Sequence, residues 1–395
     1  MLRIMAWNIE RFGINKLLTN RNWDKNASRR AHIRSTIETV APHLIVVQEV
    51  QTTWTAFGDL ISGGAGPAAV RSLREWLVGR FPGDEWSLVP PVVLNPVAGY
   101  AEGIGVFFDA NRLSFEGPMV WTKAGIRPAG GVAVPALYPK PWKTTMPEAA
   151  SHTPPGTPQN RLAGQYKFLN GAARLEFGGP RTRSLWQTRF WDKVANRYLD
   201  LYSLHFPPQL GKATSALKDL ATYPPFRVAP APAEDRVIIG DFNINANSAN
   251  GALFEQFTDE RQAIAGAPIV PLRYRLVFEA AVRRTTTVRR VLGADTTGSF
   301  PLYGYSARNA AGRPKALDNA LVIRGGGRGA PRRPRVVNRV VFPPIDMART
   351  IPQINRGLPL GGGAPKKQFN TLVNFGHIGG GRGASDHLPI VFDLP

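Results

Sequence analysis

The sequence contains no cysteine among its 395 residues. This absence excludes disulfide bonds, a catalytic thiol and zinc sites built on cysteine, and it leaves the redox compartment open. Acidic residues are also scarce, with 28 Asp and Glu against 49 Lys and Arg, so the formal net charge is +21. A positive field of this size attracts polyanions, above all nucleic acid and secondly anionic membranes or cell walls. A general basic bias that only affects solubility is the alternative interpretation.

The chain also lacks an apolar leader and a long hydrophobic run. Residues 1–5 lead directly into the polar segment 8–11, and no window is apolar and long enough to cross a membrane. We therefore expect a soluble protein without a signal peptide or transmembrane segment. Its localisation stays open between the cytoplasm and export by a leaderless route.

Glycine and proline, in contrast, are abundant, with 40 and 35 residues, and they indicate many turns and irregular connections. Aromatic residues make up 10% of the chain and hydrophobic residues 43%, enough for a sizeable core. No repeat of fixed period is present. We expect one domain over residues 1–395, with irregular insertions at about 124–165, 325–335 and 345–384.

Short apolar runs alternate with amphipathic segments along the chain. The run Leu44–Val47 is apolar and β-branched and then turns polar at Glu49, which is typical of a buried strand that delivers a side chain to a cleft. The run Val237–Ile239 followed by Asp241 repeats this pattern. Strands are predicted at 2–9, 43–50, 86–90, 102–108, 113–121, 172–178, 184–191, 197–205, 236–241, 317–323 and 388–394, and helices at 28–41, 67–81 and 212–222.

Polar residues that can bind metal or transfer protons stand at the ends of six predicted strands. They are Asn8, Glu49, Asp241 with Asn243, Asp318 with Asn319, Asp386 with His387, and His205. Oxygen ligands suit a hard cation, so Mg²⁺ is the expected cofactor, with Mn²⁺ or Ca²⁺ as alternatives. The lack of cysteine and of paired histidine ligands disfavours a dedicated zinc site. Each residue alone would more often be a turn former or a cap.

Six short motifs match a known family in content and order. They are Ala6-Trp7-Asn8, Val47-Gln48-Glu49-Val50, Ser203-Leu204-His205, Gly240-Asp241-Phe242-Asn243, Leu317-Asp318-Asn319 and Ser385-Asp386-His387. With them the chain resembles the endonuclease/exonuclease/phosphatase superfamily over essentially its full length. The resemblance implies an α/β fold of the α+β type, a four-layered α/β/β/α sandwich of two packed mixed β-sheets flanked by helices, with long loop insertions.

The resemblance also implies a role for each matched residue. Glu49 would hold the metal, assisted by Asn8 and Asp386. Asp241 and Asn243 would orient the attacking water and donate to a phosphate oxygen. His387 would be the general base or an imidazolium that contacts the phosphate.

Asp318 would align the ring of His387. Within the superfamily, the chain is most like the deoxyribonuclease I branch. His205 resembles deoxyribonuclease I, the sphingomyelinases and the inositol phosphatases, whereas Tyr100-Ala101-Glu102 is similar to a Tyr-x-Glu of deoxyribonuclease I. A pair of Glu102 and His205 would hold the general acid. Gln51 departs from deoxyribonuclease I, which has a groove-inserting arginine at this position, so the resemblance does not extend to that groove contact.

Basic residues cluster in sequence beside the Asp318 strand and the Ser385 turn. Together with Tyr100, the expected nucleic-acid-binding residues are Arg324, Arg328, Arg332, Arg333, Lys366, Lys367 and Arg382. Such side chains neutralise phosphates without reading bases. The alternative is that these Gly/Arg and Gly/Lys tracts are solvated loops.

The leading functional hypothesis is a divalent-metal-dependent phosphodiesterase, a nonspecific endonuclease that hydrolyses DNA by a two-histidine acid/base mechanism, with RNA as a further substrate. One alternative is a lipid-directed phosphodiesterase or phosphatase, similar to sphingomyelinases or phosphoinositide phosphatases. The other is a catalytically inactive nucleic-acid-binding relative. We expect a monomer, with an inhibitor protein as partner if the protein is a toxin.

Overall fold

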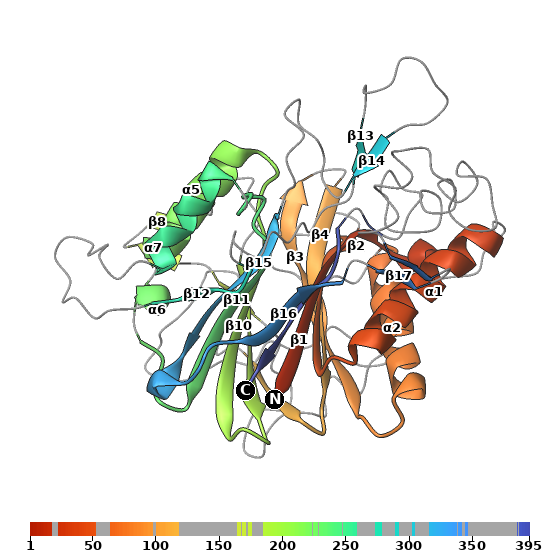
Figure 1. Ribbon diagram of the computed structural model, residues 1–395, viewed down its shortest axis with the longest axis horizontal. Coiled ribbons are helices and arrows are strands. Elements are labelled where there is room, and N and C mark those ends of the chain that lie inside the picture. The colour runs from red at the N-terminus through yellow and green to blue at the C-terminus, as the bar shows by residue number, and fades with distance from the viewer. Residues whose placement is uncertain are drawn as a thin grey trace.

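Two mixed β-sheets lie face to face in the computed structural model, with helices on both outer sides (Figure 1). The structure describes residues 1–17, 23–52, 64–97, 100–117, 164–166, 168–170, 173–175, 185–222, 224–227, 229–246, 248–258, 273–278, 289–291, 302–304, 316–337, 339–341, 344–346, 385 and 387–395. None of the helices in this part of the chain is both long and apolar enough to cross a membrane.

The first sheet has the strand order β16-β19-β1-β2-β4-β3. Its strands are β1 (Leu2–Phe12), β2 (Leu44–Thr52), β3 (Trp86–Val97), β4 (Tyr100–Asp109), β16 (Arg332–Val336) and β19 (Ile390–Leu394). β1 and β2 are parallel, and all other pairs in this sheet are antiparallel. β19 therefore inserts between β1 and β16, with Leu2 opposite Leu394.

The second sheet has the order β12-β15-β11-β10-β9-β5, with β6 also paired to β9. Its strands are β5 (Leu113–Gly117), β6 (Gly164–Tyr166), β9 (Leu185–Asp192), β10 (Arg197–His205), β11 (Glu234–Asp241), β12 (Arg275–Leu276) and β15 (Asp318–Arg324). β10 and β11 are parallel. Three short ribbons pair β7 (Phe168–Asn170) with β8 (Ala173–Leu175), β13 (Arg289–Val291) with β14 (Leu302–Gly304), and β17 (Arg339–Val341) with β18 (Pro344–Asp346).

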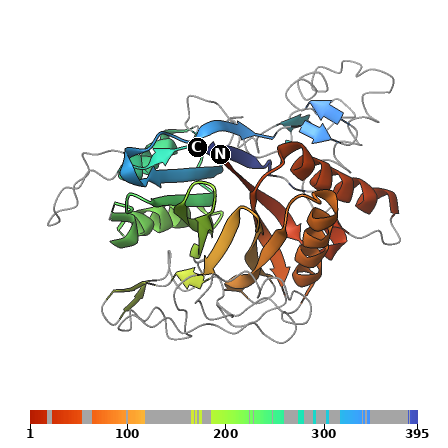
Figure 2. The same cartoon turned by 90° about the horizontal axis from the view of Figure 1, so that it is seen from below.

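Apolar faces of the helices close the sandwich from both sides. α1 (Trp23–Val40) and α2 (Gly66–Arg80) share a core with both sheets, whereas α5 (Leu210–Thr222), α6 (Pro224–Arg227) and α7 (Glu255–Thr258) share a second core with the other face of the second sheet. Short 3₁₀ turns lie at η1 (Ile14–Lys16), η2 (Ala249–Phe254) and η4 (Gly325–Gly327). The predicted four-layered α/β/β/α fold is confirmed, as Figures 1 and 2 show.

The structure differs from the sequence prediction at several element ends. α1 begins at Trp23 rather than at residue 28, and β3 continues to Val97 rather than to residue 90. The tract 325–335, predicted to be irregular, contains most of β16, which pairs with β19. An edge strand needs backbone partners on one side only and tolerates charged, exposed side chains, so the absence of apolar residues did not exclude a strand. The other predicted insertions lie outside the described residues, apart from β6 and β18.

Buried charges join the strand ends where the two termini lie. Arg197 Nη2 is 2.7 Å from Asp235 Oδ1, and Arg324 Nη2 is 3.0 Å from Asp235 Oδ2. On the same sheet, Arg236 Nη1 donates to Tyr274 Oη at 3.0 Å. Burial raises the pKa of Tyr274 to about 12, an effect that the Arg236 cation partly offsets.

Parallel pairing determines where the polar strand ends lie. The carboxyl ends of β1 and β2 point to the same edge of the first sheet, and those of β10 and β11 to the same edge of the second. β1 contacts β11, which brings the two edges together. The residues predicted at these strand ends therefore meet at one end of the sandwich, opposite the termini.

Candidate active site

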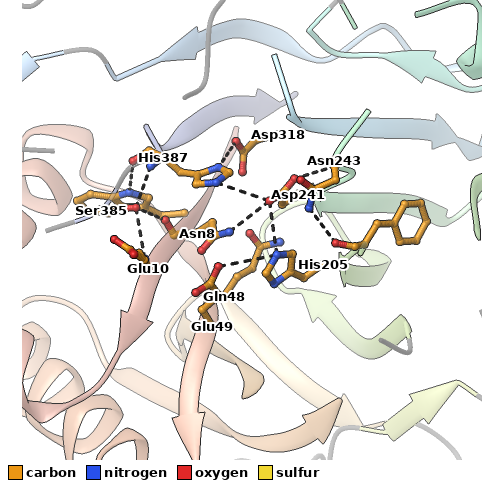
Figure 3. Close-up of polar contacts among 12 residues, drawn as sticks. Asn8, Glu10, Gln48, Glu49, His205, Asp241, Asn243, Asp318, Ser385 and His387 are labelled. Atoms are coloured by element: carbon orange, nitrogen blue, oxygen red, sulfur yellow. Dashed lines mark hydrogen bonds and ion pairs between the residues drawn. The ribbon is translucent and has the colours of Figure 1, made fainter. Parts of the chain in front are cut away.

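Side chains from both sheets converge at this end of the sandwich (Figure 3). The first sheet contributes residues of β1, β2 and β4 together with the segment before β19, and the second contributes the ends of β10, β11 and β15. The side chains brought together are Asn8, Glu49, Glu102, His205, Asp241, Asp318 and His387. All are buried except Glu49, whose side chain is 12% exposed. Residues predicted from six separate motifs thus form one cluster.

Asp241 lies at the centre of the cluster. Its Oδ2 atom is 3.3 Å from Asn8 Nδ2, 3.5 Å from His205 Nε2 and 3.7 Å from His387 Nε2. Its Oδ1 atom accepts a hydrogen bond from the backbone N–H of Asn243 at 2.8 Å. One buried carboxylate therefore faces both histidine rings.

Each histidine ring is held from behind by a second carboxylate. His205 Nδ1 is 2.8 Å from Glu102 Oε1, and His387 Nδ1 is 2.8 Å from Asp318 Oδ2. Because a carboxylate only accepts hydrogen bonds, the bond to Asp318 places the proton of a neutral His387 ring on Nδ1, whereas the His205–Glu102 contact has an ion-pair distance without hydrogen-bond geometry. Nε2 of His387, which faces Asp241, is then available to accept a proton.

The backbone that carries Glu49 leaves ordinary strand geometry. Glu49 has φ 58°, and the pairing of β2 with β4 shifts between Val47 and Val50. Arg11, with φ 51°, donates its backbone N–H to Glu49 Oε2 at 3.0 Å. A left-handed conformation costs a residue with a side chain about 1–2 kcal/mol, and such strain clusters at functional sites. The bulge turns Glu49 toward the cluster.

Ser385 anchors the turn that carries His387. Its Oγ atom accepts from the His387 backbone N–H at 2.9 Å and donates to the Asn8 carbonyl oxygen at 2.5 Å. Trp7 Nε1 donates to the His387 carbonyl oxygen at 2.9 Å. These bonds attach the turn to β1. The sequence interpretation used Asp386 and His387 of this motif and missed the anchoring role of Ser385, and Asp386 lies outside the described residues.

Two amides of the motifs bind backbone groups. Asn319 accepts from the Phe278 N–H at 3.1 Å and donates to the Phe278 carbonyl oxygen at 3.0 Å, so it fastens the second sheet. Asn243 Nδ2 donates to the Phe206 carbonyl oxygen at 2.8 Å. This bond holds Asn243 between the turns that follow β10 and β11.

The predicted arginine cluster lies away from the site. Asp318 begins β15 and Arg324 ends it, which places the two residues about 20 Å apart at the usual rise per strand residue. Arg324 is buried and bonds Asp235 and the carbonyl oxygen of Pro395 at 2.8 Å. Arg332 pairs with Asp393, also at the end with the termini.

Arg324, Arg332 and the adjacent Arg333 therefore lie at the end of the sandwich with the termini, and nucleic-acid binding by them stays a prediction. Arg328 follows η4 beyond the same end of β15. The reason is that β15 crosses the whole sheet, so closeness in sequence to Asp318 does not give closeness in space. Lys366, Lys367 and Arg382 lie outside the described residues, as does the side chain of Tyr100 at the start of β4.

The donor set of the cluster fits a hard divalent cation. Two groups of side chains can converge on an ion, one formed by Glu49, Glu102 and His205 and the other by Asp241, Asp318 and His387. The Oδ1 atom of Asn8 is buried and has no hydrogen-bond partner among the described residues. An unpartnered buried oxygen beside several carboxylates suits Mg²⁺, Mn²⁺ or Ca²⁺, which prefer oxygen ligands.

Comparisons with known proteins give similarity at the level of structure only. No family model matches the sequence, and neither does any curated protein. Among solved structures, the chain is similar to TDP2 of D. rerio in complex with a single-strand DNA product, at 13% identity and a TM-score of 0.45 over 100% of this chain and 99% of that one. It is also similar to an endonuclease/exonuclease/phosphatase family protein from Leptotrichia buccalis C-1013-b, at 10% identity and a TM-score of 0.45 over 100% of both chains. The human Nocturnin catalytic domain with bound sulfate gives 12% identity and a TM-score of 0.42 over 100% of this chain and 94% of that one.

Proposed function

We propose that this chain is a divalent-metal-dependent phosphodiesterase of the endonuclease/exonuclease/phosphatase superfamily, acting as a nonspecific endonuclease on DNA and also on RNA. The observation that carries the proposal is the pair of histidines, each oriented by its own carboxylate, on either side of the buried Asp241. Hydrolysis of a phosphodiester needs one group that takes a proton from water and one that gives a proton to the leaving oxygen. Two oriented histidines can divide these tasks.

In the proposed reaction, Nε2 of His387 accepts the proton of the attacking water. His205, protonated at Nε2, gives a proton to the oxygen that leaves as the P–O bond breaks. Asp318 and Glu102 stabilise the imidazolium form of their respective rings. Asp241 accepts a hydrogen bond from Nε2 of the protonated His205 and another from the attacking water. After one turnover the two rings exchange protons with solvent, which restores the starting state.

Glu49 and Asn8 are the residues that would hold the metal, and Asp386 is a further ligand expected from the sequence. Bound there, Mg²⁺ would supply positive charge that offsets the charge developing on the phosphate oxygens. Glu49 suits this role because its side chain is partly exposed and its backbone is turned toward the cluster.

The net charge of +21 favours nucleic acid as the substrate class. Each phosphate that enters a positive field adds to the binding free energy. A lipid substrate would instead call for apolar side chains that enter a membrane. The large hydrophobic residues exposed in the described part of the chain are Met1, Val78, Val194 and Leu210. They are scattered over the residue before β1, α2, the turn after β9 and the start of α5, so they form no membrane-facing patch.

A substrate panel tests this proposal. Purified protein would be incubated with supercoiled plasmid, single-stranded DNA, RNA, abasic duplex and sphingomyelin vesicles, each with Mg²⁺ and with EDTA. We expect cleavage of plasmid, single-stranded DNA and RNA with Mg²⁺ and none with EDTA. A folded protein that leaves all nucleic acids intact in both Mg²⁺ and Mn²⁺ would refute the proposal, and turnover of sphingomyelin alone would favour the lipid-directed alternative.

Matched histidine variants separate this activity from a contaminating nuclease. His387→Ala should lower turnover by about 10²–10⁴-fold, as loss of a proton-transfer group does. His43→Ala is the control, because His43 lies before β2 and its Nδ1 accepts from the Arg3 N–H at 3.0 Å, away from the cluster. If His387→Ala and His43→Ala cleaved equally well, the cleavage would come from a contaminating nuclease.

A further inference from the structure

The side chain of Gln48 crosses from the first sheet to the second directly beneath the site (Figure 3). Gln48 lies in β2, beside Asn8 of β1, and is completely buried. Its Nε2 atom donates to the carbonyl oxygen of Leu204 in β10. A buried amide that spans two sheets in this way is a polar link within an otherwise apolar interior.

Gly240 leaves the space that this link needs. A Cβ atom added at Gly240 would come within 3.0 Å of both Gln48 Nε2 and the Leu204 carbonyl oxygen, closer than real Cβ atoms approach. Gly240 also has φ 146°, a conformation that residues with side chains rarely adopt. The glycine of the Gly-Asp-Phe-Asn motif is therefore required for the amide of Gln48 to reach β10.

Each of the three residues in this link directly precedes a residue of the site. Gln48 precedes Glu49, Leu204 precedes His205, and Gly240 precedes Asp241. Leu204 and Gly240 are also direct neighbours in the parallel pairing of β10 with β11. Any change in the separation of the sheets at Gln48 is thus transmitted through one peptide unit to groups on both sides of the cluster.

We propose that Gln48 is a positioning residue that sets the distance between the metal-binding half of the site on the first sheet and the proton-transferring half on the second. The inference rests on the proposed function. Gln48 itself is buried below Glu49 and touches no reacting atom. Its effect on turnover comes from the placement of Glu49 relative to Asp241 and His205, where a displacement of about 1 Å can cost about 10²-fold in rate.

Two variants and a matched control test the role of Gln48. Gln48→Met keeps the length of the side chain and removes the donor, whereas Gln48→Glu places an acceptor opposite the Leu204 carbonyl oxygen. The control is Gln187→Met in β9. Gln187 Nε2 donates to Asp200 Oδ1 of the neighbouring strand β10 at 3.5 Å, away from the site. We expect kcat to fall by about 10²-fold in Gln48→Met and further in Gln48→Glu, with KM for duplex DNA unchanged and the control close to the parent.

Mn²⁺ binding followed by electron paramagnetic resonance gives a second readout that does not depend on turnover. We expect the affinity of Gln48→Met for Mn²⁺ to fall by about 10-fold, as it does when residues behind metal ligands are replaced. If Gln48 had a purely structural role, Gln48→Met would melt at a lower temperature. Below its melting range, however, its kcat and its affinity for Mn²⁺ would equal those of the parent. That outcome would overturn the inference.

Gly240→Ala tests the same link from the other side. Its added methyl group would meet both the Leu204 carbonyl oxygen and the amide of Gln48 and so break the link, and the double variant with Gln48→Met should lose no more kcat than the poorer single variant. Additive losses would show that the two residues act separately and would overturn the inference. Failure of the proposed function is distinguishable, because the parent protein would then hydrolyse no phosphodiester at all, while the Mn²⁺ measurement would still report on the link.

Discussion

Replacing Asp318 with asparagine tests the proposed division of labour at His387. Asp318 Oδ2 lies 2.8 Å from His387 Nδ1, and both side chains are buried. Asparagine keeps the shape but loses the charge, and a hydrogen bond to a charged partner is worth about 1 kcal/mol more than a neutral one. The lost stabilisation of the imidazolium corresponds to about 5-fold in rate. If the new amide turns its NH₂ toward Nδ1, the proton moves to Nε2 and the ring can no longer accept from water, so the loss grows to about 10²-fold or more.

The assay is steady-state cleavage of a fluorescent duplex at saturating Mg²⁺ near neutral pH. We expect a lower kcat, an unchanged KM, and no further loss when Asp318→Asn is added to His387→Ala, because residues that act as a unit are not additive. Asp192→Asn is the matched control, since Asp192 is a buried carboxylate whose Oδ2 lies 3.2 Å from Arg112 Nη2, outside the cluster. A catalytic role of the Asp318–His387 pair would be refuted if Asp318→Asn kept the parental kcat. It would also be refuted if Asp318→Asn lowered kcat by the same factor in the parent and in His387→Ala.

Three further changes give separate readouts. Glu49→Gln should raise the Mg²⁺ concentration needed for half-maximal cleavage by at least about 10-fold, because a neutral amide is a poorer ligand; an unchanged Mg²⁺ titration would place the metal elsewhere. Arg324→Leu should lower the free energy of unfolding by about 2 kcal/mol in urea titrations, since it removes one of the two buried arginine partners of Asp235, and should leave kcat unchanged. Tyr274→Phe loses the bond to Arg236 and should be less stable by about 1–2 kcal/mol near neutral pH. The raised pKa of Tyr274, about 12, adds stability that is present below pH 10 and is lost as the pH rises toward 12, so unfolding curves of parent and variant should converge over that interval.

The parts of the site that the sequence predicted are those encoded within a single strand. The β-branched run before Glu49 and the run before Asp241 each indicate a buried strand with a functional carboxyl end, and no distant contact is needed to detect it. Parallel pairing then brings such ends to one edge, as β1 with β2 and β10 with β11 show. The layered fold was expected from the family resemblance of the six motifs, whereas element ends, which depend on pairing, could not be predicted.

The parts that were missed depend on contacts between residues far apart in the chain. Arg324 is close to Asp318 in sequence, yet the strand between them carries it across the sheet to Asp235. Gln48 is a single amide in an apolar run, and its partner Leu204 is 156 residues away. The only local signal for Gln48 was a polar residue where the burial of the strand called for an apolar one.

β19 inserts between β1 and β16, so the pairing of β1 is completed by a strand that the ribosome makes much later. β1 is made well before β19, the neighbour that completes its pairing, and His387 lies 380 residues after Trp7 of β1. A growing chain thus carries Asn8, Glu49 and Asp241 without the second histidine. Closing a contact over so long a stretch is also a slow step in folding. The proposed centre is therefore complete only once the segment that carries His387 has been made and β19 has paired with β1.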